Sequence, residues 1–215
     1  KSKKSKKNNT LTHLFSSYQK DFNFENFVQS SLNISVEKVN NDTYLKVFDS
    51  NLVNTDLKPD NFDTLSSNIN FNLENEKFSF ETGFTAYEDL SKSNSDRFQY
   101  VLPYYDFSKS FFNNNLASFD FDSQGDNILK DTNSLRSRMI NNLNVQSIDY
   151  FSKNGFKNNL NYYLKNTINA GKNNSEYDSS PQIKFMNIFE VVSSFPLIKK
   201  DESFINYLNP KLSLR

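Results

Sequence analysis

The sequence contains no cysteine, and its only histidine is His13. Without cysteine the chain has no disulfides, thiol nucleophiles or thiolate metal sites. One histidine excludes the common His/Cys metal sites and leaves a single candidate base for a catalytic triad. The 4 glycines leave no glycine-rich phosphate loop. We therefore predict that the chain is not an enzyme and has no catalytic residue, cofactor or metal site.

Long apolar segments are missing as well. No run of about 18 apolar residues is present, so no transmembrane helix is predicted. No signal peptide opens the chain, although an exported protein needs one, and we expect an internal fragment or a processed piece.

The charges balance, with 25 Lys and Arg against 25 Asp and Glu. No basic excess therefore suggests a nucleic-acid partner. The lysines at the start, Lys1–Lys7, read as a solvated loop rather than a phosphate-binding arm, because no aromatic residues are interleaved with them.

The composition is polar but rich in aromatic residues. Hydrophobic residues make up 36% of the chain, and yet it contains 22 Phe and 11 Tyr. The mean hydropathy is −0.72. Disordered chains lack such an aromatic content, and a compact globular domain of this size buries a larger apolar core. A transmembrane barrel wall, with one apolar and one polar face, has this composition.

Apolar and polar residues alternate with the period of a β-strand through most of the chain. The clearest case is Asn68–Glu74, in which Ile69, Phe71 and Leu73 alternate with asparagines. Similar patterns predict strands around Leu32–Glu37, Phe78–Ala86, Arg97–Tyr104, Ala117–Asp122 and Gly155–Asn169, with weaker ones at Leu14–Phe22, Ser134–Tyr150, Ile183–Val191 and Leu208–Leu214. The pattern places Phe98, Tyr100, Leu102 and Tyr104 on one face. Ser134–Leu143 also fits a helix, because Leu135, Met139, Ile140 and Leu143 share a helical face, although asparagine and serine are weak helix formers.

The predicted connections differ in length. Tight turns are predicted at Asn75-Glu76 and at Lys153-Asn154-Gly155, where glycine supplies a positive φ. Longer loops are predicted at Asn40–Thr64, Glu88–Asp96, Gln124–Asn133 and Ala170–Ser180, and further links at Phe107–Asn115 and Ser194–Ser203. Rough alternation of short and long connections is typical of outer-membrane barrels. We predict an all-β fold of antiparallel up-and-down strands, with residues 1–215 forming a fragment of about ten strands from a large transmembrane outer-membrane β-barrel and no complete second domain.

Four cationic residues fall on the predicted polar faces of two neighbouring strands: Arg136, Arg138, Lys157 and Lys165. They can simply solvate the lumen, or they can contact a phosphorylated glycolipid, since Arg and Lys pair well with phosphate. Asp120 and Asp122 also share a polar face, where polar residues are expected without any catalytic role.

Several motifs resemble a known family. Arg97–Ser108 (RFQYVLPYYDFS), Leu135–Arg138 with Tyr150–Phe156, and Ser194–Lys200 followed by Leu208–Leu212 resemble, in order and spacing, strands of the LPS-assembly outer-membrane protein family LptD, also called the organic solvent tolerance protein family. The resemblance covers most of Ser66–Arg215. Asn209 and Lys211 depart from the family pattern, which has Glu and Arg there.

The resemblance implies a translocon component that exports lipopolysaccharide and inserts it into the outer leaflet of the outer membrane of a Gram-negative bacterium. It implies a lipoprotein plug inside the barrel and periplasmic β-jellyroll bridge proteins as partners. The lipid would pass between strands while its sugars cross the polar lumen.

Two other classes of protein also fit the composition and the strand pattern. One is a different outer-membrane barrel, such as a porin-like channel or a TonB-type receptor. The other is a soluble or surface-attached β-rich binding module.

Overall fold

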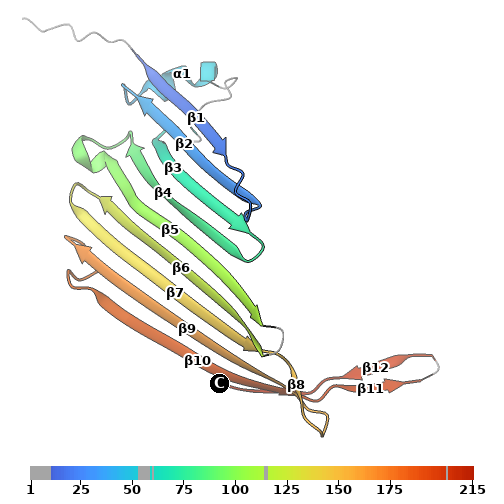
Figure 1. Cartoon of the computed structure of the whole chain (residues 1–215). Helices are drawn as coiled ribbons and strands as arrows, with labels where there is room; N and C mark the ends of the chain where they lie inside the picture. The colour runs from blue at the N-terminus through green and yellow to red at the C-terminus, as the bar shows by residue number, and fades with distance from the viewer. Residues whose placement is uncertain (1–10, 53–58, 60, 114–115, 202) are drawn as a thin grey trace, which may run out of the picture.

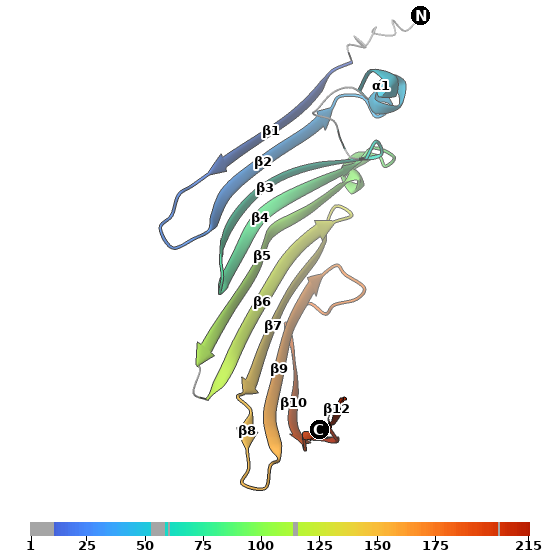
Figure 2. The same ribbon diagram turned by 90° about the vertical axis from the view of Figure 1, so that its right-hand side faces the viewer.

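The computed structural model describes residues 11–52, 59, 61–113, 116–201 and 203–215. Most of these residues form one antiparallel sheet with up-and-down topology, in which the strands lie side by side in a single layer (Figures 1 and 2). The predicted lysine-rich loop at Lys1–Lys7 lies outside the described residues.

The elements follow in this order: β1 (His13–Asp21), β2 (Gln29–Val39), α1 (Tyr44–Leu52), β3 (Thr64–Asn75), β4 (Phe78–Asp89), the 3-10 helix η1 (Asn94–Arg97), β5 (Phe98–Asn113), β6 (Ala117–Lys130), β7 (Ser134–Ser147), β8 (Tyr150–Phe151), β9 (Lys157–Lys172), β10 (Gln182–Ser194), β11 (Leu197–Lys200), β12 (Ile205–Leu208) and β13 (Lys211–Leu214). The main sheet has 11 strands, ordered β1-β2-β3-β4-β5-β6-β7-β9-β10-β13, with β8 paired to β9. β11 and β12 form a separate hairpin that extends away from this sheet (Figure 1). The sheet is open in the described part of the chain, because no pairing joins β1 to β10 or β13.

The alternating segments are confirmed as strands. Ile69 pairs with Phe84 across β3 and β4, so the apolar positions of adjacent strands share a face. The helical alternative for Ser134–Leu143 is wrong, because this segment belongs to β7 and pairs on both sides. Gly155 has a φ of +83°, as the predicted turn requires.

Several predicted boundaries are wrong. The predicted loop at Gln124–Asn133 is mostly strand, since β6 runs on to Lys130 and pairs with β7 along its whole length. β5 likewise runs to Asn113, through most of the predicted link at Phe107–Asn115. Leu208 belongs to the separate hairpin and only Lys211–Leu214 joins the main sheet. Polar residues interrupt the alternation of apolar and polar side chains before these strands end, so the strands were predicted too short. Backbone pairing continues wherever a neighbouring strand supplies hydrogen-bonding partners.

Tyr104 does not share a face with Phe98 and Tyr100. The register between β4 and β5 shifts, so that Tyr104 pairs with Gly83 whereas Tyr100 pairs with Ala86. Residues 83 and 86 of β4 point to opposite faces, because side chains alternate along a strand. The irregularity in β5 at Leu102 and Pro103 therefore moves Tyr104 to the polar side.

A short helix, α1, occupies the predicted loop at Asn40–Thr64. Its Leu45 is fully buried and packs with Val39, Tyr44, Leu65 and Leu90. Asn41 begins the helix region by accepting hydrogen bonds from the N–H and hydroxyl of Thr43, at 2.9 and 2.7 Å. Leu45 and its apolar neighbours form the buried core of the described residues, at the end of the sheet where β2 ends and β3 begins (Figure 1).

Truncation of this core should release α1. Leu45→Ala should destabilise the helix by about 2–5 kcal/mol, because it deletes buried apolar atoms and leaves a cavity. Amide hydrogen exchange in α1 should then accelerate by roughly 30-fold or more. Val47→Ala is the matched control, since Val47 in the same helix is 62% exposed. Equal acceleration in both variants would contradict the assigned core.

Candidate functional site

The sheet has one apolar face and one polar face. The apolar face is defined here as the face that carries Ile69 and Phe84, and the polar face is the opposite one. Most of the sheet's large apolar side chains that are at least 37% exposed lie on the apolar face: Leu14, Tyr18, Ile69, Phe84, Phe111, Phe119, Met139, Leu160, Ile183, Phe185, Phe189, Leu212 and Leu214. Among the described strand residues, the register places four exposed large apolar residues on the polar face: Tyr87, Phe151, Tyr163 and Met186. Apolar side chains therefore cover one side of the layer and remain exposed there.

Aromatic rings form a row across one end of the apolar face. The ring centroids are 5.6 Å apart between Phe27 and Phe78, 5.5 Å between Phe78 and Phe107, and 6.0 Å between Phe107 and Phe121. The row runs from the β1–β2 connection to β6 on the side of the short β3–β4 turn. Edge-to-face and tilted geometries of this kind stabilise neighbouring strands.

A row of polar side chains crosses the middle of the apolar face. The Ser123 hydroxyl donates to Asn141 Oδ1 at 2.7 Å, and Asn141 Nδ2 donates to Asn166 Oδ1 at 3.1 Å. The Tyr105 hydroxyl lies 3.0 Å from Ser123 Oγ, and it acts as the donor because Ser123 already donates to Asn141. The row thereby satisfies polar groups that would be costly on an apolar surface.

All four predicted cations lie on the polar face. Arg138 pairs in register with Asn169, and Lys165 with Asn142, which places β7 and β9 residues on the same side. Both arginines bind one carboxylate, with Arg136 Nη2 2.8 Å from Asp126 Oδ1 and Arg138 Nη2 3.2 Å from Asp126 Oδ2. A phosphate group would therefore have to compete with Asp126, which already neutralises part of the charge of the two arginines.

The two lysines, Lys157 and Lys165, lie at other positions along the strands than the two arginines. Lys157 begins β9 and forms an ion pair with Asp149 at 2.6 Å. Lys165 lies near the middle of β9, and no ion pair engages it within the described residues. Arg136 pairs with Gly171 near the opposite end of β9, so roughly 45 Å of strand separates Arg136 from Lys157. The four cations form a strip along the strands and not a single binding site.

The polar face is divided by charge, which the sequence reasoning missed. β3 to β6 contribute mostly acids to this face: Glu74, Glu81, Asp89, Asp106, Asp120, Asp122 and Asp126, with Lys130 as a cation at the end of β6. β7, β9, β10 and β13 contribute mostly cations: Arg136, Arg138, Lys157, Lys165, Lys184, Lys211 and Arg215. Glu190 is an acid within the cationic half, where Arg215 Nε donates to it at 2.8 Å. Each of these charged residues follows the alternation of polar and apolar side chains in its own strand. Only the order of the strands shows that most acids lie on one half of the polar face and most cations on the other.

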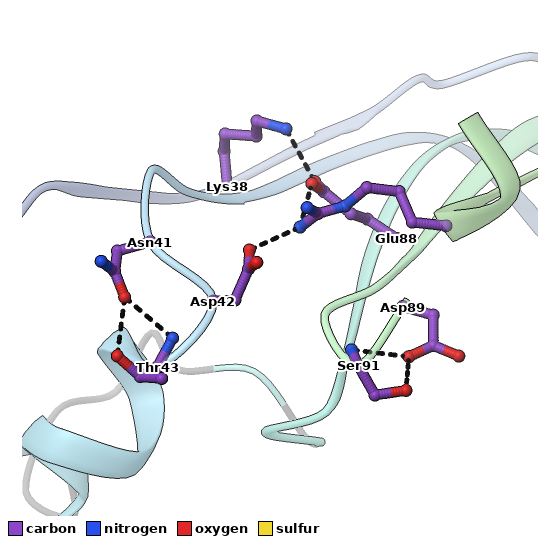
Figure 3. Close-up of polar contacts among 8 residues, drawn as sticks. Lys38, Asn41, Asp42, Thr43, Glu88, Asp89 and Ser91 are labelled. Carbon is purple, nitrogen blue, oxygen red and sulfur yellow. Dashed lines mark hydrogen bonds and ion pairs between the residues drawn. The ribbon is translucent and has the colours of Figure 1, made fainter. Parts of the chain in front are cut away.

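An ion-pair network fixes the end of the sheet near α1. Glu88 is 8% exposed, and its carboxylate contacts Lys38 Nζ at 2.7 Å and Arg97 Nη2 at 2.9 Å (Figure 3). Arg97 Nη2 also lies 2.9 Å from Asp42 Oδ1. The network joins β2, β4, η1 and the connection before α1, so it holds this end of the sheet together.

The single histidine, His13, lies against aromatic side chains at the start of β1. His13 Nδ1 lies 2.5 Å from the Tyr44 hydroxyl, and its ring stacks on Phe15. The part of the chain that the structure describes has no group of three or more His, Asp or Glu side chains placed to hold a metal ion. Within the same residues, no helix is long and apolar enough to cross a bilayer.

The fold places the chain in the class of antiparallel up-and-down β-sheet proteins with almost no helix. Compared with known proteins, it matches no protein-family model and no curated sequence.

The polar row predicts a measurable coupling between Asn141 and Asn166. In a double-mutant cycle to alanine, measured by chemical unfolding, the coupling energy should be about 0.5–1 kcal/mol, as for other hydrogen bonds in apolar surroundings. The pair Asn141 and Asn72 serves as the control and should show no coupling, since Asn72 lies on the polar face of β3. Additive effects at Asn141 and Asn166 would remove the row as a cooperative unit.

Proposed function

We propose that the chain is part of the wall of an outer-membrane β-barrel that exports lipopolysaccharide and inserts it into the outer leaflet. The apolar face contacts lipid, and the polar face lines a passage for the sugars and phosphates of the glycolipid. The observation that carries the proposal is the large apolar face, exposed on one side of a layer whose other side is charged.

The exposed apolar face supports a membrane location. Soluble monomers rarely expose contiguous apolar patches of more than a few hundred Å². Here the exposed residues continue from Leu14 in β1 to Leu214 in β13, without a second layer packed on them in the described residues. A bilayer would cover this face without further protein.

Strand length and the aromatic row agree with this location. A tilted strand needs about 9–11 residues to cross a bilayer. β5 and β9 have 16 residues each, and β3 and β4 have 12 each. The row of phenylalanines near the short-turn end suits an interfacial aromatic girdle.

The substrate is inferred from the resemblance of Arg97–Ser108 and the later motifs to the LptD family, together with the polar face. Arginine and lysine pair with phosphate, and Lys165 keeps its charge unpaired in the described residues. The same resemblance suggests a lipoprotein plug and periplasmic β-jellyroll proteins as partners.

The two faces should respond oppositely to a new charge. Phe84 and Thr85 are adjacent mid-strand residues of β4 that point to the apolar and the polar face, respectively. Phe84→Lys should oppose bilayer insertion by about 2–4 kcal/mol, whereas Thr85→Lys should have little effect. Insertion into liposomes can be followed by heat-modifiable gel mobility. A wild-type chain that is folded and monomeric in buffer, with Phe84→Lys harmless, would favour a soluble β-rich binding module.

Charge reversal at Lys165 tests the passage. Lys165→Glu should slow glycolipid delivery to the outer leaflet several-fold without reducing the amount of assembled protein, because it repels phosphate at mid-strand. Lys92→Glu, in the β4–β5 connection, is the control. Delivery is measured by surface labelling of the glycolipid. Unchanged delivery together with measurable ion conductance would point to a porin-like channel.

A further inference from the structure

A polar cavity of about 580 Å³ lies at the end of the polar face, where several strands meet their loops. Gln99 of β5 and Arg136 of β7 contribute to its lining from the sheet. Asn133 comes from the β6–β7 turn, and Asn173 and Asn174 come from the β9–β10 loop. The volume falls in the range of sites for small organic ligands.

Hydrogen bonds between the loops hold this cavity in shape. Asn173 Nδ2 donates to the Asn133 carbonyl at 3.3 Å, and Asn174 Nδ2 donates to Ser134 Oγ at 3.4 Å. Asn174 Oδ1 also accepts the backbone N–H of Glu176 at 2.8 Å, which orients its amide. On the other side, the Thr132 hydroxyl donates to Asp96 Oδ1 at 2.5 Å and ties the β6–β7 turn to η1.

The lining offers unused hydrogen-bonding groups. Within the described residues, no hydrogen bond engages the side-chain amides of Gln99 and Asn133. An amide supplies both donors and an acceptor, as adjacent sugar hydroxyls require.

The charges of the lining balance. Lys130 and Arg136 face Asp131 and Glu176, and Arg136 is also bound by Asp126. An isolated anion would gain little from such a balanced site. Ile128 is the apolar member of the described lining, so an apolar ligand would leave the amides unpaired.

We propose that this cavity is a binding site for a neutral saccharide unit. The assignment rests on the proposed function, because it takes the outer sugars of an exported glycolipid as the natural ligand. The site holds the sugar at the end of the polar face through the amides of Gln99 and Asn133 and the Arg136 side chain.

Saturation-transfer NMR tests the site directly, using the chain in a zwitterionic detergent that has no sugar headgroup. The probes are glucose, galactose and lactose, with inorganic phosphate as competitor. Saturation transfer to at least one sugar is expected in the wild type. It should fall at least 5-fold in Gln99→Ala/Asn133→Ala and stay unchanged in Asn72→Ala, a polar-face control outside the cavity.

The outcomes separate the site from the wider function. Absence of saturation transfer for every sugar, equal transfer in the double variant, or displacement of the sugar by phosphate would overturn the assignment. Circular dichroism verifies that the variants are folded, and the single variant Asn133→Ala, in an exposed turn, replaces the double variant if that one misfolds. Sugar binding by a chain that does not insert into liposomes would support the saccharide site and contradict the proposed role as a barrel wall. Insertion into liposomes without sugar binding would support the barrel wall and contradict the saccharide site.

Discussion

Antiparallel pairing in a single layer is the constraint on which the rest of the structure depends. With no second sheet packed on it in the described residues, each strand side chain lies on one of two faces. The registers then fix every neighbour: Phe111 pairs with Phe119, and Phe119 with Val145. A slip of one residue would exchange apolar and charged side chains between the faces, so the hydrophobic pattern and the backbone pairing specify the same register.

The register shift in β5 adjusts this arrangement without breaking the sheet. It places the consecutive residues Tyr104 and Tyr105 over glycines of different neighbouring strands. A Cβ at Gly83 would lie 2.9 Å from the Tyr104 hydroxyl and 2.3 Å from the Ile69 carbonyl oxygen, and a Cβ at Gly125 would lie 2.4 Å from the Tyr105 ring. Only glycine leaves room for these rings. Tyr104 thereby reaches Asn70 and Glu81 on the polar face, whereas Tyr105 joins the polar row on the apolar face.

The same constraint explains why many charged contacts lie on the polar face and why the enclosed volume lies at the end of the sheet near α1. On the polar face, charges from separate strands become neighbours, as when Asp126 binds both Arg136 and Arg138. At the α1 end, loops are long enough to build structure of their own: α1 brings Leu45 into a buried core, and the β9–β10 loop reaches across to Asn133 and Ser134. A layer one side chain thick offers little interior, and these strand ends provide the enclosed volume.

The sequence by itself determined the strands and their two faces, because alternation such as that of Ile69, Phe71 and Leu73 requires only the period of an extended chain. It also placed Arg136, Arg138, Lys157 and Lys165 on one polar side. Only the tertiary structure decided where strands such as β6 end, which face Tyr104 takes and that α1 packs on the sheet end, since these depend on the partners that neighbouring strands supply. The division of the polar face into acidic and cationic halves and the cavity beside Asn133 were decided in the same way. Both join residues that are far apart in the chain, and local periodicity carries no information about which strands become neighbours.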